Sequence, residues 1–145
     1  MNVKTKLGTF WVEWSDQGIT GVGFAAKPVK SSQTHAVAGE LRRYAAGKQV
    51  RWSARMDLSG GTPFQRKVWG ALRQIPYGQT RSYAWVAQRI GKPKAARAVG
   101  AACGANPIPV IIPCHRVVAS DGSLGGYSAG LAWKRKLLRL EGVAV

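Results

Sequence analysis

Acidic residues are scarce in this chain of 145 residues, which has 6 Asp and Glu, 22 Lys and Arg, and a formal net charge of +16. No carboxylate falls between Asp57 and Asp121. Basic residues do fall there, namely Arg66, Lys67, Arg73, Arg81, Arg89, Lys92, Lys94, Arg97 and Arg116. A magnesium ion held by carboxylates, as in many nucleases, therefore has almost no ligands in this stretch. Because solvated surfaces normally mix both signs of charge, the imbalance predicts a polyanionic partner, with nucleic acid favoured.

Cysteine and histidine are also scarce, with two of each. Cys103 and Cys114 do not make the disulfide framework of a small secreted protein, so a reducing compartment is expected. The rival interpretation is a zinc site built from both cysteines, His35 and His115. Adjacent ligands such as Cys114 and His115 suit tetrahedral geometry badly, so we expect neither a metal nor a cofactor. Cys103, at the end of an alanine-rich segment, is interpreted as an inert core residue.

Long apolar runs are missing as well. The longest, IPVIIP at 108–113, is far too short to cross a bilayer, and residues 1–10 lack the apolar region of a signal peptide. With 46% hydrophobic residues and six tryptophans, the chain can still form a core without metal or disulfide bonds. We therefore expect a soluble, cytoplasmic, monomeric protein with no membrane partner.

Two domains are expected, a small α/β N-terminal domain at 1–60 and a mainly α C-terminal domain at 61–145. Apolar and polar residues alternate on both sides of SDQG within 8–25, which predicts a β-hairpin with a short turn. A helical apolar pattern follows at 34–47, and period two returns at 50–58. The N-terminal domain is therefore expected to be ββαβ-like, with a small antiparallel sheet and one helix.

The second domain begins with a capping box at 62–65, and its first helix is predicted to continue to Ile75. Ser82 can cap a further short helix, GKP forms a turn, and 94–103 forms the next helix. This helix-turn-helix pattern on a basic background favours nucleic-acid binding. A terminal helix at 129–142 is expected to turn four residues toward the core: Leu131, Trp133, Leu137 and Leu138.

The helix at 94–103 has an unusual composition, because Arg97 is the only long side chain in its middle. The rest of that middle is alanine, glycine and valine, whereas major-groove recognition helices usually carry several polar residues. One interpretation is a small-residue face packed tightly against another helix. The other is a helix that approaches a phosphate backbone closely and pushes Arg97 into the duplex. Both stay open on the sequence alone.

Cys114 and His115 are adjacent and follow the proline-bracketed run IPVIIP. A nearby imidazole lowers the pKa of a thiol from about 8.5, and a carboxylate usually orients that imidazole. Asp121 and Glu141 are the acids that follow Asp57, and Glu141 is better anchored because it closes the terminal helix. A relay of Cys114, His115 and Glu141 is therefore a candidate, provided that a turn or a bridging water connects the two neighbours.

Several segments resemble the O6-alkylguanine-DNA alkyltransferases, the suicide DNA repair proteins. PCHRV resembles their active-site signature, and four longer segments follow in the family's order: FQRKVWGALRQIPYGQTRSYAWVA, KAARAVGAA, NPIPVIIPCHRVV and GSLGGYSAGLAWKRKLLRLEG. The resemblance covers Pro63 to Gly142, and residues 1–60 resemble a compact version of the family's variable N-terminal domain. The zinc-binding cysteines that some members carry in that domain have no counterpart here, because the first cysteine is Cys103.

The resemblance implies direct-reversal repair of double-stranded DNA that carries O6-alkylguanine, with O4-alkylthymine as a second candidate substrate. Cys114 would take the alkyl group irreversibly, once per chain. His115 would act as base through a water, Glu141 would hold it, and Asn106 would support the active-site turn. The protein would be cytoplasmic and associated with the nucleoid through its DNA binding.

The resemblance also assigns contacts with DNA. Tyr83 would push on the phosphate of the target nucleotide and contact the guanine, because the base must leave the duplex for a thiolate to reach O6. Arg97 would fill the gap from a helix lying in the minor groove. The other DNA-binding residues implied are Lys94, Ala95 and Ala96. The glycine-rich loop at 120–130, read as a flexible rim, would complete a pocket lined by Tyr83, Val117, Tyr127 and Ser128.

Two other functions remain as alternatives. A non-catalytic protein that flags alkylated bases or regulates transcription would share the basic surface, but alkyltransferase-like proteins of that kind lack the cysteine that Cys114 supplies here. A cysteine hydrolase would turn over a small ester or amide. It would leave both the basic stretch and the helix that carries Arg97 unexplained.

Overall fold

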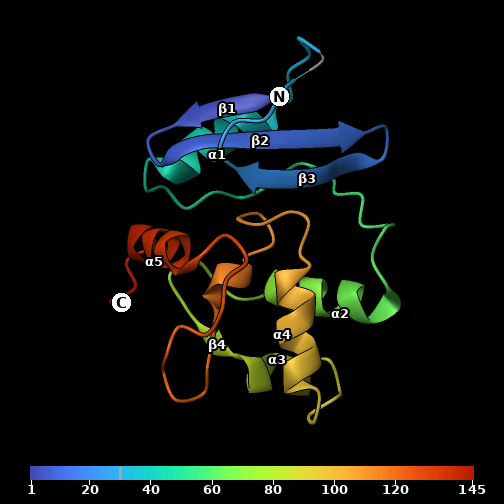
Figure 1. Cartoon of the computed structure of the whole chain (residues 1–145), viewed down its shortest axis with the longest axis vertical. Coiled ribbons are helices and arrows are strands. Elements are labelled where there is room, and N and C mark those ends of the chain that lie inside the picture. Colours follow the sequence, from blue (N-terminus) through green and yellow to red (C-terminus); the bar gives the residue numbers. More distant parts are fainter. Residues whose placement is uncertain (30) are drawn as a thin grey trace. The chain divides into compact units, whose positions relative to one another are not determined.

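The computed structural model describes residues 1–29 and 31–145. The chain divides into two compact units, Met1–Leu58 and Ser59–Val145 (Figure 1). Small sheets and short helices together make up the fold. In the described part of the chain, no helix has the length and apolar character needed to span a bilayer.

The first unit is a three-stranded antiparallel sheet with one helix (Figure 1). Its strands lie in chain order and are β1 (Asn2–Thr5), β2 (Gly8–Ser15) and β3 (Gly18–Phe24). Helix α1 (Val37–Ala45) buries Val37, Leu41 and Tyr44 beside the sheet residues Val3 and Phe10. The β2–β3 hairpin confirms the prediction. Strand β1 was not predicted, because four residues are too few to establish an alternating pattern.

The expected strand at 50–58 is wrong. Side-chain burial does alternate there, but the backbone forms one isolated bridge, between Met56 and Ile19 of β3. Two hydrogen bonds attach the segment, from Ile19 N to Arg55 O (2.9 Å) and from Asp57 N to Ile19 O (2.8 Å). The side chain of Glu40 in α1 also holds this segment, because its carboxylate accepts a hydrogen bond from Ser53 N. The unit is therefore βββα with an irregular return, and not ββαβ.

The second unit is mainly helical, with one short parallel pair of strands. Its elements are α2 (Pro63–Leu72), β4 (Arg81–Ser82), α3 (Tyr83–Arg89), α4 (Ala96–Gly104), the 3-10 turn η1 (Cys114–Arg116), β5 (Val117–Val118) and α5 (Leu131–Leu140). The capping box of α2 is present in full, and the Ser82 hydroxyl accepts from Trp85 N at the start of α3. Both caps confirm the sequence prediction.

Helix boundaries differ from the expected ones. Helix α2 ends at Leu72, and Ile75 is buried in the turns that follow. Helix α4 begins at Ala96, so Lys94 and Ala95 precede it, and it includes Gly104. Helix ends depend on local turns and packing as well as on pattern, which explains errors of two or three residues.

The inward face of α5 also differs. Leu137 and Leu138 are fully buried, but Leu131 is 40% exposed. The buried row continues with Lys134, which is 0% exposed, and ends at Glu141. Two charged residues therefore lie on the inner face of the helix, and an apolar pattern could not identify them.

Candidate active site around Cys114

The turn that carries Cys114 rests on a buried apolar segment. Ile108, Val110 and Ile112 are 0% exposed. Val110 has φ +76°, a conformation that is strained for a β-branched residue. Asn106 holds this turn closed, because its Nδ2 donates to Ile112 O (2.8 Å) and its Oδ1 accepts from Ile108 N (2.9 Å). The segment therefore forms a stiff support directly before the cysteine.

The 3-10 turn η1 carries the two adjacent residues Cys114 and His115, and both are buried. Cys114 is 5% exposed and His115 is 0% exposed. Cys114 N donates to Ile112 O at 2.8 Å, which ties the turn to the segment below it. A strand would send the two side chains to opposite faces, whereas a tight turn does not.

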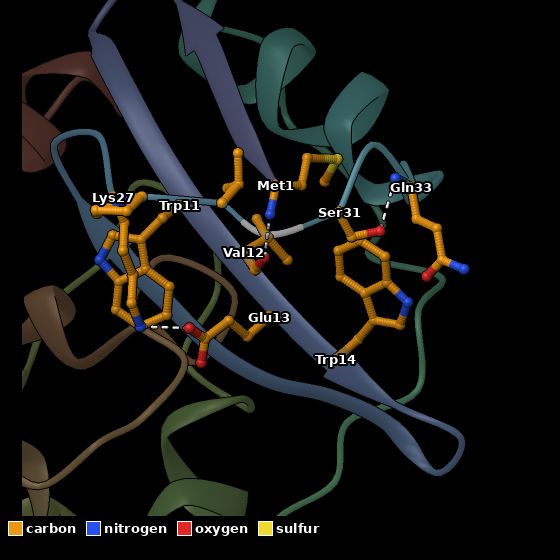
Figure 2. A pocket seen from close by; sticks show the side chains of 10 residues that line it. Met1, Trp11, Val12, Glu13, Trp14, Lys27, Ser31 and Gln33 are labelled. Atoms are coloured by element: carbon orange, nitrogen blue, oxygen red, sulfur yellow. Dashed lines mark hydrogen bonds and ion pairs between the residues drawn. The ribbon is translucent and has the colours of Figure 1, made fainter.

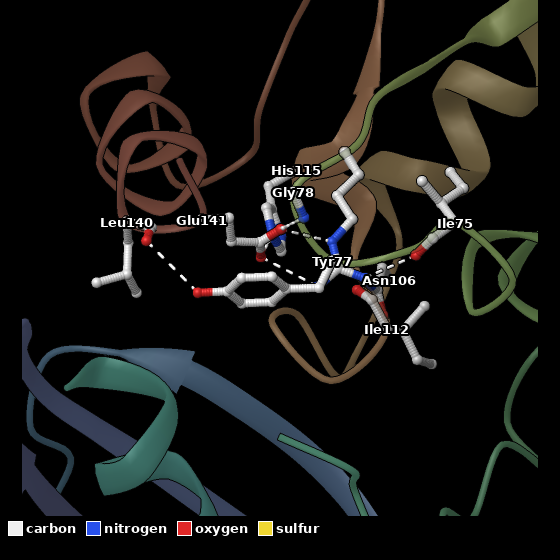
Figure 3. Close-up of polar contacts among 9 residues, drawn as sticks. Ile75, Tyr77, Gly78, Asn106, Ile112, His115, Leu140 and Glu141 are labelled. Atoms are coloured by element: carbon white, nitrogen blue, oxygen red, sulfur yellow. Dashed lines mark hydrogen bonds and ion pairs between the residues drawn. The ribbon is translucent and has the colours of Figure 1, made fainter. Parts of the chain in front are cut away.

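The carboxylate of Glu141 is the shared hydrogen-bond acceptor for residues of η1 and for Gly78 (Figure 3). Its Oε2 lies 2.6 Å from His115 Nε2, and its Oε1 accepts from Gly78 N at 3.0 Å. Arg116 donates through Nε (2.8 Å) and Nη2 (3.1 Å) to the same carboxylate. Because a carboxylate accepts, the proton of a neutral His115 ring lies on Nε2, and Nδ1 is then its basic nitrogen.

Burial and pairing set the charges of this network. Burial alone would raise the pKa of Glu141, but hydrogen bonds from His115 and Arg116 outweigh it and lower the pKa well below its usual range. Burial lowers the pKa of His115 more than Glu141 raises it. His115 is therefore neutral at pH 7, which is the form in which an imidazole can accept a proton.

Arg116 lies inside the second unit, contrary to its interpretation as one of the basic residues that indicate a polyanionic partner. It is 8% exposed, pairs with Glu141 and donates from Nη1 to Ile75 O (2.7 Å). Its positive charge is therefore neutralised by Glu141 inside the second unit and does not contribute to a basic surface. The sequence held no signal for this, because Glu141 is 25 residues away.

Cys114 opens onto a cavity of about 270 Å³. The cavity is lined by Tyr83, Gly100, Cys103, Gly104, Cys114, Gly126, Tyr127 and Ser128. The structure thus brings Tyr83 of α3 together with Tyr127 and Ser128 of the glycine-rich loop. Val117 does not line it, since its side chain is 0% exposed within β5. Cys103 does line it, which corrects its interpretation as a core residue.

The pKa of Cys114 is raised above that of an ordinary thiol, because burial outweighs the groups that favour the thiolate. Burial raises its pKa, while hydrogen bonds with Asn106 and Tyr127 and the charge of Lys134 lower it. For Cys103, burial raises the pKa to about 12. The two thiols share one cavity, but Cys114 alone has hydrogen bonds that stabilise a thiolate.

Helix α4 presents its small residues outward. Val99 and Ala102 are buried, and Trp69 Nε1 of α2 donates to Ala102 O at 2.8 Å. Ala98 and Ala101 are exposed. Arg97 and Lys94 are exposed too, whereas Ala95 and Ala96 are half-buried. Packing against α2 therefore uses only one side of the helix, and the other side is a smooth surface with a single arginine.

A larger cavity, of about 520 Å³, lies in the first unit between β2 and the segment after β3 (Figure 2). Trp11 and Trp14 line it, and Lys27 pairs with Glu13 at its edge. The described residues that line it include no cysteine and no histidine. Within residues 1–29 and 31–145, no three His, Cys, Asp or Glu residues cluster in a way that could hold a metal ion.

Solved structures that are similar to this chain include O6-methylguanine methyltransferases and a protein bound to damaged DNA. The O6-methylguanine methyltransferase of Mycobacterium tuberculosis superposes with a TM-score of 0.84 at 38% identity, covering 99% of this chain and 93% of that one. The same organism's enzyme in complex with DNA gives 0.83 at 37% identity, over 97% and 90%. The Schizosaccharomyces pombe protein Atl1, bound to damaged DNA containing O6-carboxymethylguanine, gives 0.51 at 36% identity, over 56% and 77%.

Residues 63–143 match the family described as 6-O-methylguanine DNA methyltransferase, DNA binding domain. The chain belongs to this family. It is 42% identical to the methylated-DNA–protein-cysteine methyltransferase of Mycolicibacterium paratuberculosis, over 96% of this chain and 89% of the relative. With the Mycobacterium bovis protein of the same name, identity is 53% over 70% of this chain and 61% of the relative. The matched part thus spans less than two thirds of that relative.

Proposed function

We propose that this chain repairs alkylated DNA by direct reversal, with Cys114 as the acceptor of the alkyl group from O6-alkylguanine. The supporting observation is the position of Cys114, which lines a cavity beside Tyr127 and precedes a histidine buried against Glu141. Residues 61–145 would carry both the reaction and DNA binding through a helix-turn-helix, and residues 1–60 would form the variable α/β domain. O4-alkylthymine is a second candidate substrate.

The reaction needs one proton transfer and one displacement. His115 Nδ1 takes the proton of Cys114, through a bridging water, while Glu141 stabilises the resulting imidazolium. The thiolate sulfur then bonds to the alkyl carbon as the bond between that carbon and O6 breaks. Guanine leaves with the electron pair of that bond and takes up the proton that the His115 imidazolium releases, so that the base returns to its neutral form. The product thioether is stable, so each chain reacts once and needs no cofactor.

DNA binding follows from α3 and α4. The exposed alanine surface of α4 lets the helix lie close in a minor groove, with Arg97 filling the space of the extruded base. The start of this helix contacts the phosphate backbone of the DNA through Lys94, Ala95 and Ala96. Tyr83, on the cavity wall, contacts the guanine. A monomer suffices for this arrangement, and a cytoplasmic location near the nucleoid is where such a protein would act.

The test is the intact mass of the protein after mixing with duplex DNA that carries one O6-methylguanine. We expect a gain of one methyl group per chain, limited to one equivalent and lost in Cys114→Ser. Tight binding without a change in mass would instead support the lesion-flagging alternative. Equal gains in the wild-type and Cys114→Ser proteins would overturn Cys114 as the acceptor.

A further inference from the structure

Lys134 is a fully buried lysine whose three donors are all used. Its Nζ donates to Val117 O (2.6 Å), Gly126 O (3.0 Å) and Leu124 O. Three carbonyl acceptors match the three protons of an ammonium group, so the lysine is present as a cation. In the described part of the chain, none of the ion pairs includes it. A buried charge held by neutral carbonyls is costly, and such an arrangement calls for a function.

The three carbonyls belong to the two segments that border Cys114. Val117 lies in β5, directly after the turn Cys114–Arg116. Leu124 and Gly126 lie in the loop at 120–130, which forms no helix or strand. This loop supplies Gly126, Tyr127 and Ser128 to the cavity. Lys134 therefore cross-links a wall of the cavity to the strand that follows the nucleophile.

The charge of Lys134 also acts on the cavity. Its Nζ lies 6.0 Å from the ring centre of Tyr83, and it lowers the pKa of both Cys114 and Cys103. The other titratable groups around Cys114 are Tyr83 of α3, Cys103 of α4, Tyr127 of the loop and His115. Burial raises the pKa of the two tyrosines and Cys103 and lowers that of His115, so all four are neutral at pH 7.

We propose that Lys134 is a positioning residue for alkyl transfer, which fixes the loop at 120–130 as a wall of the cavity and favours the thiolate of Cys114. This inference rests on the proposed function. An ammonium group suits both tasks, because it satisfies three carbonyls from one point and carries a charge that a neutral donor lacks. The loop position then sets which alkyl groups the cavity accepts.

Two readouts test the proposal. The first is the pH dependence of Cys114 alkylation by iodoacetamide, which needs neither DNA nor a repair reaction. In Lys134→Met, a side chain of similar length, the midpoint should rise by about one pH unit because a nearby cation is lost. The second is the rate of methyl transfer from the methylated duplex, which should fall at least about tenfold as the thiolate fraction falls. Lys136→Met, an exposed lysine of the same helix, is the matched control for both readouts.

The variant Lys134→Arg distinguishes the positioning of the loop from the effect of the charge. It can also be measured if the methionine variant does not fold. It keeps a cation, so the midpoint should stay unchanged, but its planar fork cannot meet the same three carbonyls and repair should slow. Wild-type rates and midpoints in the Lys134 variants would overturn the role of Lys134. A wild-type protein that takes no methyl group from DNA would instead overturn the proposed function, whatever the iodoacetamide profile.

Discussion

His115 Nε2 lies 2.6 Å from Glu141 Oε2, and both side chains are fully shielded from solvent. The same carboxylate receives two bonds from Arg116 and one from Gly78 N. One acid from the end of α5 thus fixes the ring of His115 and neutralises a buried arginine. Removing it should affect both the reaction and the fold.

Glu141→Gln should therefore slow alkyl transfer by about 100-fold, because the ring of His115 loses its orienting charge. It should also lower the free energy of unfolding by about 3 kcal/mol, since Arg116 is left buried without a counter-charge. Transfer kinetics by mass and urea unfolding measure the two effects. Glu13→Gln, which breaks an exposed ion pair in the first unit, is the control and should change neither. Wild-type kinetics in Glu141→Gln would contradict the proposed relay.

Stability should fall as the pH is lowered from neutral, in two steps. The pKa of His115 is lowered on folding, so the unfolded chain binds a proton first, and stability is lost once the pH falls below about 6.5. The pKa of Glu141 is also lowered, so its contribution is present above about 4.3 and is lost as the pH falls further. Urea midpoints from pH 8 to well below pH 4 test both steps. A midpoint that rises on acidification would show that His115 gains a proton on folding.

Asn106→Ala should destabilise the support below Cys114. It removes the bonds to Ile108 N and Ile112 O. Ile112 O still accepts from Cys114 N, but the buried N–H of Ile108 loses its acceptor, at a cost of about 1–3 kcal/mol. It also removes a hydrogen bond that lowers the pKa of Cys114, so the iodoacetamide midpoint should move upward. Asn2→Ala, at an exposed contact in the first unit, provides the comparison. An unchanged midpoint would leave Asn106 with a purely structural role.

Arg97→Ala should slow repair of duplex DNA more than repair of free O6-alkylguanine base, because its exposed side chain is proposed to fill the space of the extruded base. Single-turnover rates on both substrates measure the difference. Affinity for duplex should also fall steeply with salt, since several phosphates are neutralised. Equal losses on duplex and free base would count against the extrusion role.

Cys103→Met should narrow the range of alkyl groups. The larger side chain would enter a cavity of about 270 Å³, leaving room for methyl but not for benzyl. Competing rates on O6-methylguanine and O6-benzylguanine give the ratio, and Cys103→Ala should shift it the other way. Because burial raises the pKa of Cys103 to about 12, neither variant should change the limit of one alkyl group per chain. If the ratio of the two rates is the same in both variants and in the wild type, residue 103 does not limit the size of the alkyl group.

Local patterns predicted the parts of the fold that local chemistry controls. Thr62 and Ser82 cap their helices because each lies within reach of the first orphan amides. The β2–β3 hairpin follows from alternation and a two-residue turn. The segment at 50–58 shows the limit, since its alternation describes burial but says nothing of whether a partner strand continues alongside it.

The sequence by itself determined the family, the adjacency of Cys114 and His115, and a basic chain with few acids to oppose it. Tertiary structure decided which charges are at the surface. Arg116 and Lys134 count equally toward +16, yet both are buried by acceptors 25 and 17 residues away. A long cationic side chain is stable inside only where distant backbone and carboxylate groups converge on it, and no local pattern encodes that convergence.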